Sequence, residues 1–199
     1  MTISAVLLSG GESRRMGKDK ATIIFRGRPL WQTQLDLLRK LDPAEIFVSA
    51  RTDPVWRPDE YTFVADESPS RGPLSGIAAA LKQIHSNHLL VLAIDMPFMS
   101  ETYLRSLCDL VAPGCGVVPK IEDRFEPLAA IYPRKALADF EKALASDDFS
   151  LQTLTTRLIE SGKLHAISVV DEARAFFWNL NQPSDLEDEA APSLSSLSR

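Results

Sequence analysis

The segment Ser9–Lys20 concentrates the residue types that bind phosphate. Its adjacent glycines, Gly10 and Gly11, let the backbone approach a ligand closely and turn its N–H groups inward, which makes a nest for an anion. The basic residues of the segment are Arg14, Arg15, Lys18 and Lys20, and its acidic residues are Glu12 and Asp19. Arginine supplies forked donors that match phosphate oxygens. We therefore predict that this segment binds a small anionic ligand.

Two well-known phosphate loops do not fit this segment. A P-loop has four residues between its glycines and a Ser or Thr after the lysine. Here five residues separate Gly11 from Gly17, and Asp19 occupies the hydroxyl position. The dinucleotide fingerprint GxGxxG fails because Gly10 and Gly11 are adjacent. A plain turn with solvated charges is the remaining alternative, and the density of glycines, hydroxyls and basic residues argues against it.

Size and composition bound the class of protein. The chain has 199 residues, of which 45% are hydrophobic and 25% charged, as expected for one soluble globular domain. Its net charge of −5 argues against a broad basic surface for nucleic acid. No apolar run approaches the roughly 20 residues of a membrane helix, and no basic residues precede the first apolar stretch. We expect no membrane segment and no signal peptide, and the cytoplasm as the compartment.

The apolar segments alternate between two patterns along the first half of the chain. Short continuous apolar runs, typical of strands buried on both faces, cover residues 6–8, 46–48 and 89–94. Segments with helical spacing lie between them and after them, over residues 30–41, 74–84 and 104–111. This alternation predicts an α/β fold with a mainly parallel central sheet.

The second half is less regular, and we expect it to add antiparallel strands to that sheet. Strands are predicted over residues 116–118, 128–132, 166–170 and 176–181, and helices over 134–145 and 151–162. Pro183 is predicted to start a short acidic helix. We expect a single domain over residues 1–189 and a disordered tail over residues 190–199.

Carboxylates follow two of the predicted strands. The buried strand 89–94 delivers Asp95 to the same sheet edge as the glycine-rich segment, and this edge is where ligands bind in open α/β sheets. Mg²⁺ prefers one or two carboxylates and completes its shell with phosphate oxygens and water. Asp66 follows another short strand, but there a helix cap or a turn is a strong alternative.

Other residues carry weaker signals. The small residues of segment 72–76 open a helix, where a purine could lie against the backbone or the helix could simply pack close to the sheet. Asn179 and Asn181 could orient metal or phosphate, or could be turn residues. The remaining candidates are expected to be structural: solvent-exposed histidines at His85 and His88, core tryptophans at Trp31 and Trp178, and a buried thiol at Cys108.

Five ordered motifs resemble those of the molybdenum cofactor guanylyltransferase (MobA) family. They are Leu8-Ser9-Gly10-Gly11-x-Ser13-x-Arg15-Met16-Gly17-x-Asp19-Lys20-Ala21, Arg28-Pro29-Leu30, Gly72-Pro73-Leu74-Ser75-Gly76-Ile77, Asp95-Met96-Pro97 and Asn179-Leu180-Asn181-Gln182-Pro183. The resemblance covers the chain up to about residue 190 and implies a three-layer Rossmann-like (GT-A-like) fold. The chain departs from the family at Ser9, where Ala is usual, and at Ser49, where some members place Asn.

The resemblance implies transfer of GMP from GTP to molybdopterin with release of pyrophosphate. It places Mg²⁺ on Asp95 and catalytic roles on Arg15, Lys20 and Asp95. The residues expected to bind the nucleotide are Leu8, Ser9, Gly10, Gly11, Lys20, Ser49, Asp66, Gly76 and Asp95. GTP and molybdopterin are the expected small-molecule partners, and proteins that mature molybdoenzymes are candidate protein partners. Neither nucleic acid nor a membrane is expected.

Two rival functions keep the same motifs. A cytidylyltransferase that acts on the same pterin with CTP would share the glycine-rich segment and Asp95. A nucleotide-binding regulator would keep the segment without chemistry, although the presence of Lys20 and Asp95 argues against it. The choice of base rests on the resemblance, because no hydrogen-bond pattern in the sequence identifies it.

Overall fold

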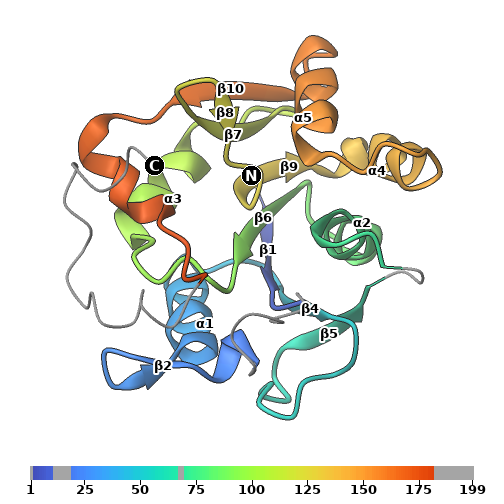
Figure 1. Ribbon diagram of the computed structural model, residues 1–199. Coiled ribbons are helices and arrows are strands. Elements are labelled where there is room, and N and C mark those ends of the chain that lie inside the picture. The colour runs from blue at the N-terminus through green and yellow to red at the C-terminus, as the bar shows by residue number, and fades with distance from the viewer. Residues whose placement is uncertain (1, 11–18, 67–69, 182–199) are drawn as a thin grey trace.

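The computed structural model describes residues 2–10, 19–66 and 70–181 (Figure 1). The strands are β1 (Ile3–Leu8), β2 (Ile24–Phe25), β3 (Arg28–Pro29), β4 (Ile46–Ala50), β5 (Thr62–Ala65), β6 (His88–Ala93), β7 (Gly116–Ile121), β8 (Arg124–Phe125), β9 (Ala129–Pro133) and β10 (Leu164–Ser168). The α-helices are α1 (Leu30–Lys40), α2 (Pro73–Gln83), α3 (Glu101–Asp109), α4 (Leu137–Leu144) and α5 (Leu151–Glu160). Three short 3-10 helices are η1 (Lys20–Thr22), η2 (Arg134–Ala136) and η3 (Asp171–Phe177).

An eight-stranded sheet runs through the molecule in the order β10-β7-β9-β6-β1-β4-β5, with β8 paired to β7. Strands β6, β1, β4 and β5 are parallel to one another. Strand β9 is antiparallel to both β6 and β7, and β10 returns parallel to β7. The predicted fold class, a mainly parallel sheet with antiparallel additions in the second half, is confirmed.

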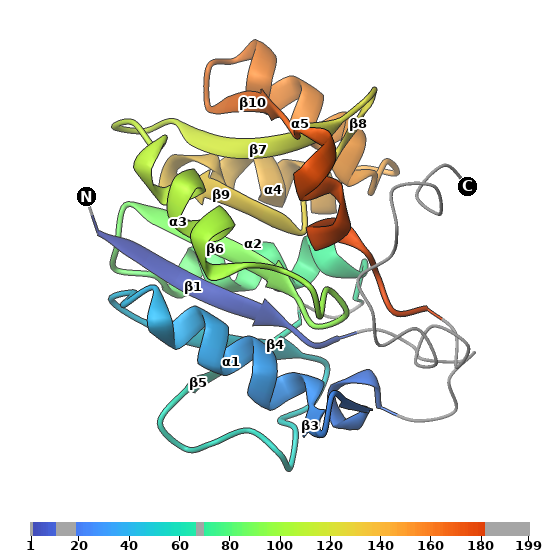
Figure 2. The same ribbon diagram turned by 90° about the vertical axis from the view of Figure 1, so that its left-hand side faces the viewer.

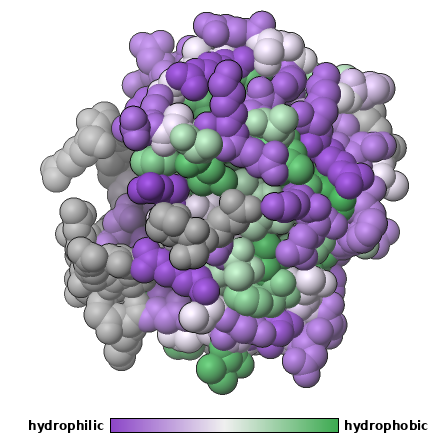
Figure 3. All heavy atoms as spheres, turned by 90° about the vertical axis from the view of Figure 1, so that its right-hand side faces the viewer, coloured by the Kyte–Doolittle hydropathy of each residue, from purple (hydrophilic) through white to green (hydrophobic). Residues whose placement is uncertain are grey.

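Helices cover both faces of this sheet, which gives three layers (Figure 1, Figure 2). Alternate residues of β1 enter different cores: Ala5 and Leu7 pack with α1, α3 and η3, whereas Val6 and Leu8 pack with α2, α4 and α5. Burial on both faces explains why the strands read as continuous apolar runs. The helices turn polar sides outward, and hydrophilic residues cover much of the face that carries α2 and α4 (Figure 3).

Local signals set several helix ends. The hydroxyl of Ser100 accepts a hydrogen bond from the Tyr103 N–H and caps α3. Gly162, with φ of +67°, follows the end of α5, where a left-handed residue ends a helix at no steric cost. Among the described residues, none of the helices combines the length and the apolarity that a membrane crossing requires.

The predicted strand over residues 176–181 is wrong. Its aromatic residues lie in and after η3, and their rings pack on Tyr103 of α3 with centroid distances of 5.7 Å for Phe176 and 5.3 Å for Phe177. Strand preference reflects packing on a half-buried surface, and here a helix supplies that surface instead of a neighbouring strand. The predicted acidic helix after Pro183 and the tail 190–199 lie outside the described residues.

His88 also differs from the prediction. His85 is exposed as expected, but His88 begins β6, pairs in register with Ile3 and Pro133, and is fully buried. The strand starts earlier than its apolar run because neighbours on both sides extend the ladder to this residue. Burial, the largest cause, lowers the pKa of His88, while hydrogen bonding of the ring to the backbone of Ala112 and Cys115 acts to raise it.

This burial predicts a loss of stability in mild acid. The unfolded chain takes up a proton on this imidazole near its ordinary pKa of about 6.5, whereas the folded chain does so only at lower pH. The unfolded state therefore binds more protons within that window, and the free energy of unfolding should fall as the pH decreases through it. Urea unfolding of the wild type and of His88→Leu from about pH 8 to about pH 5 tests this. As the pH decreases, the free energy of unfolding of the wild type should fall relative to that of His88→Leu. Parallel curves would contradict the prediction.

Candidate functional site

The candidate site lies where the parallel strands end (Figure 2). After each of β1, β5 and β6, the backbone makes one further hydrogen bond to the neighbouring strand. The Ser9 N–H donates to the Ser49 carbonyl at 2.9 Å, and the Asp66 N–H donates to the Ala50 carbonyl at 3.0 Å. The Ile94 N–H donates to the Leu8 carbonyl at 3.0 Å. These bonds fix the backbone that leads into the polar residues, so Ser9, Asp66 and Asp95 emerge at one edge of the sheet.

One cluster joins the ends of β1, β4 and β5 to helix α2. The buried Ser49 hydroxyl donates to Oδ1 of Asp66 at 2.9 Å, and the Ser70 hydroxyl donates to Oδ2 at 3.2 Å. Small residues allow this contact, because a Cβ on Gly76 would lie 2.5 Å from the Ser49 Oγ. A Cβ on Gly10 would lie 3.1 Å from the Asp66 Oδ2. The first turn of the glycine-rich segment and helix α2 therefore close on the Ser49–Asp66 pair.

A second cluster joins β6, η1 and the segment after η3. The Lys20 Nζ donates to Oδ2 of Asp95 at 2.9 Å and to Oδ1 of Asn181 at 3.2 Å. The Leu180 N–H donates to the Asp95 carbonyl at 2.9 Å, which anchors this segment to the end of β6. The Lys20 and Asp95 side chains are 17% and 21% exposed, so both charges lie at a surface that a ligand could reach.

Asp19 sets the position of Lys20. Its Oδ1 accepts from the Ala21 N–H at 3.0 Å and caps η1, and its Oδ2 accepts from the Trp56 indole N–H at 2.9 Å. The Trp56 ring stacks on Trp31 of α1 with a centroid distance of 5.7 Å. Trp31, predicted as a core residue, is partly buried against the core and also supports this cap.

The two clusters bring together most of the residues that the sequence singles out. Leu8, Ser9, Gly10, Ser49, Asp66 and Gly76 lie in or beside the first cluster, and Lys20 and Asp95 form the second. Gly11 and Arg15 lie outside the described residues. No group of three His, Cys, Asp or Glu side chains gathers within the described part of the chain. Asp95 and the nearby Asn181 offer oxygen ligands, which suit Mg²⁺ better than zinc.

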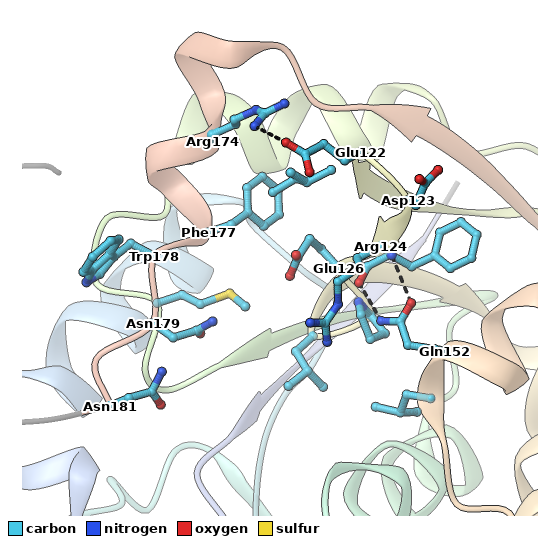
Figure 4. Close-up of a pocket in the computed structure, with 16 residues that line it drawn as sticks. Glu122, Asp123, Arg124, Glu126, Gln152, Arg174, Phe177, Trp178, Asn179 and Asn181 are labelled. Atoms are coloured by element: carbon cyan, nitrogen blue, oxygen red, sulfur yellow. Dashed lines mark hydrogen bonds and ion pairs between the residues drawn. The ribbon is translucent and has the colours of Figure 1, made fainter. Parts of the chain in front are cut away.

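A cavity of about 850 Å³ opens beside the second cluster and shares Asn181 with it (Figure 4). Its size falls within the range of small-molecule sites, roughly 300–1,000 Å³. The walls come from the β7–β8 hairpin and the turn after it, the start of α5, and the end of η3. They are formed by Met96, residues 121–128, Leu151, Gln152, Arg174, and residues 177–179 and 181. Trp178, predicted as a core residue, therefore lines a cavity.

Apart from Asn179 and Asn181, the polar groups of this cavity were missed by sequence reasoning. The Gln152 amide accepts from the Phe125 N–H at 3.1 Å and donates to the Phe125 carbonyl at 2.8 Å, which fixes the hairpin against α5. Arg174 of η3 pairs with Glu122 at 2.8 Å across the cavity rim. Residues 122–124 carry charges typical of a solvated turn. They line the cavity because η3 and α5 pack opposite them.

Glu126 is a half-buried carboxyl group in the wall of the cavity. Burial raises the pKa of Glu126 to about 7, although the Arg124 guanidinium acts to lower it. Both side chains point into the cavity (Figure 4). Tyr103, which packs on Phe177 behind the wall, has its pKa raised to about 12 by burial first and by the nearby Glu126 second. The cavity thus combines apolar walls with charged side chains, among them the Arg124 guanidinium and the Glu126 carboxyl group.

The chain matches known proteins over most of its length. Residues 5–162 match the family model described as "MobA-like NTP transferase domain". A probable molybdenum cofactor guanylyltransferase of Opitutus terrae is 35% identical over 94% of both chains. The solved molybdopterin-guanine dinucleotide biosynthesis protein A of Archaeoglobus fulgidus is 27% identical with a TM-score of 0.75, over 94% of this chain and 96% of that one. The GT-A-like fold expected from the sequence is therefore confirmed.

A more distant structure shows the fold alone. It is a Mycobacterium tuberculosis protein described in complex with manganese, and it is 16% identical with a TM-score of 0.60. The match covers 85% of this chain and 89% of that chain.

The contact between Gly76 and Ser49 yields a test by double substitution. Gly76→Ala should lower the free energy of unfolding by about 1–3 kcal/mol, because its methyl group would overlap the Ser49 hydroxyl in a packed site. In a Ser49→Ala background the hydroxyl is gone, and the same substitution should cost much less. Urea unfolding of the two single variants and the double variant measures this coupling. Additive effects would show that the two residues are not in contact.

Proposed function

The chain belongs to the MobA-like NTP transferase family, and we propose that it is a molybdenum cofactor guanylyltransferase, which transfers GMP from GTP to molybdopterin and releases pyrophosphate. The observation that carries this proposal is the place of Asp95 and Lys20 between the ends of the parallel strands and a ligand-sized cavity. On one side lie the small and polar residues around Ser49 and Gly76, and on the other side lies the cavity. An enzyme that joins two substrates needs both regions, with charged groups between them.

The nucleotide is assigned to the side of β1, β4, β5 and α2. Backbone groups at Leu8, Ser9 and Gly10 would meet the ligand, and the absence of a side chain at Gly76 lets helix α2 approach Ser49 and Asp66 closely. The further contacts proposed for Gly11 and Arg15 fall on residues outside the described ones. Arginine and backbone N–H groups match the charge and geometry of a triphosphate.

The transfer itself depends on alignment and charge. A terminal phosphate oxygen of the acceptor forms a bond to the α-phosphorus of GTP, the bond from that phosphorus to the bridging oxygen breaks, and pyrophosphate leaves with the electron pair. The acceptor phosphate is already a nucleophile, so no strong general base is required. Lys20 would offset negative charge on the leaving phosphates. Asp95, with the Asn181 amide oxygen nearby, would hold Mg²⁺, which offsets charge around the α-phosphate when bound.

The cavity is assigned to the acceptor. It shares Asn181 with the Lys20–Asp95 cluster, so a ligand that fills it can place one end beside the proposed site of transfer. The Arg124 guanidinium and the Asn179 amide add polar groups to this cavity (Figure 4). An anionic acceptor with a flat ring fits a cavity that pairs polar groups with an aromatic wall at Phe177.

Asp95→Asn should reduce pyrophosphate release from GTP by on the order of 10²–10³ in rate. The change keeps the size of the side chain and removes the charge that pairs with Lys20 and would hold the cation. The assay uses full-length protein with GTP, Mg²⁺ and a molybdopterin-loaded acceptor. Asp59→Asn, at an exposed position away from both clusters, is the matched control and should retain wild-type turnover. Near-normal turnover in Asp95→Asn would contradict the role assigned to Asp95.

The choice of base is tested separately by thermal-shift titration with GTP and CTP. A ligand that binds only the folded state raises the melting temperature by mass action, by an amount that grows with its concentration relative to Kd. We expect GTP to stabilise at lower concentration than CTP. A preference for CTP would make the protein a cytidylyltransferase. Tight GTP binding without pyrophosphate release would instead identify a regulator.

A further inference from the structure

The backbone of Glu126 is fixed between β8 and β9. Its N–H donates to the Pro119 carbonyl at 2.8 Å, and its carbonyl accepts from the Ala129 N–H at 3.2 Å. Phe125, the preceding residue, is held by Gln152 of α5. These bonds direct the side chain into the cavity, where it faces the end of η3 (Figure 4). The carboxyl group therefore occupies a defined position in a wall.

The carboxyl group of Glu126 makes no hydrogen bond or ion pair with any of the described residues. Its pKa is raised to about 7, and burial is the main cause. A half-buried carboxyl group without donors is costly to the fold, and such groups are usually satisfied by a partner. A ligand in the cavity is the partner that the geometry allows.

An ionised carboxylate is a pure acceptor with two oxygens side by side. Its best partner is a pair of parallel N–H donors, as in the fork of arginine. One edge of a pterin ring presents such a pair, the 2-amino group and the adjacent ring N–H. Phe177 lines the same cavity and can contact a face of a flat ring.

We propose that Glu126 determines the acceptor specificity by accepting two hydrogen bonds from the amino group and the adjacent ring N–H of the pterin. This inference rests on the proposed function, because molybdopterin is the acceptor assigned there. The two ends of the cavity divide the recognition: Asn181, beside Lys20 and Asp95, lies at the phosphate end, and Glu126 lies at the ring end.

Guanine presents the same pair of donors, so the position of Glu126 must distinguish the two substrates. Glu126 belongs to the antiparallel half of the sheet, next to β7, β8 and β9. The nucleotide is assigned beyond β1, around Ser49 and Gly76 in the parallel half. A pterin bound at Glu126 should therefore persist when GTP saturates the protein.

The test compares two ligands that differ only at ring position 2. Neopterin monophosphate carries the pterin ring and a phosphate, and its 2-oxo analogue replaces the amino donor by a carbonyl acceptor. Hydrogen bonds to a charged group predict that the wild-type full chain binds the amino compound about ten- to a hundredfold more tightly, measured by fluorescence titration. Glu126→Gln should reverse this preference, because its amide can donate to the 2-oxo group and accept from the ring N–H.

A merely structural role for Glu126 would weaken both ligands equally and leave their ratio unchanged. Glu126→Asp, which retains the carboxylate, should keep part of the preference for the amino compound. Glu141→Gln, an exposed substitution on α4 with the same change in charge, should keep the wild-type ratio. The GTP thermal shift of each variant reports whether the protein is folded and whether the nucleotide site is intact.

Three outcomes would overturn the inference. They are an equal affinity of the wild type for the two ligands, an unchanged preference in Glu126→Gln, and displacement of the pterin by GTP. None of them depends on turnover, so a failure here with normal GTP binding and pyrophosphate release leaves the proposed function standing. A loss of GTP binding and turnover with the pterin preference retained would instead contradict the proposed function.

Discussion

The parallel pairing of β1 with both β4 and β6 is the constraint on which the rest of the site depends. The connection from β1 to β4 runs through α1 and the connection from β5 to β6 runs through α2, and the two helices lie on opposite faces of the sheet. The chain after Leu8 therefore enters a crevice between the two connections. Ser9 and Asp95 are both delivered there because the Ile94 N–H remains bonded to the Leu8 carbonyl. The order of the strands therefore determines where the site lies, and the side chains determine what it can bind.

The Lys20–Asp95 ion pair adds a second level of organisation. At roughly one-fifth exposure such a pair contributes little to stability, because solvent screens it and ordering two side chains costs entropy. The ion pair matters because of the parts of the chain that it connects. It joins the end of β6 to η1 and, through Asn181, to the segment after η3, so three distant parts of the chain meet at one carboxylate. The phosphates and the metal of the proposed reaction need the same two charges, which the free protein holds together in pairing distance.

The sequence predicted what depends on local pattern. Continuous apolar runs identified the parallel strands, and the position of Asp95 after such a run placed it at the correct edge. The close approach of Gly76 to Ser49 could not be foreseen, because it depends on the packing angle between α2 and β4. The cavity wall was missed for the same reason. Arg124 and Glu126 belong to the β7–β8 hairpin and the turn after it, whose charges resemble those of a solvated turn. They line a cavity only because η3 and α5 pack opposite them. Phe176 and Phe177 led to the wrong prediction of a strand, because these aromatic residues pack on Tyr103 from a 3-10 helix.

The family match ends before the last segment of the chain. The family match covers residues 5–162, which include the parallel half, Asp95 and the β7–β8 hairpin, but end before η3, Asn179 and Asn181. The full-length relatives extend the likeness over 94% of the chain. The nucleotide chemistry that we propose therefore rests on elements of the shared domain, whereas the cavity is completed by a segment that follows it. Because η3 is anchored through Leu180 to the Asp95 carbonyl, that later segment is fixed to the centre of the site. A change in η3 can reshape the cavity for a different acceptor while the parallel half and its nucleotide contacts stay as they are.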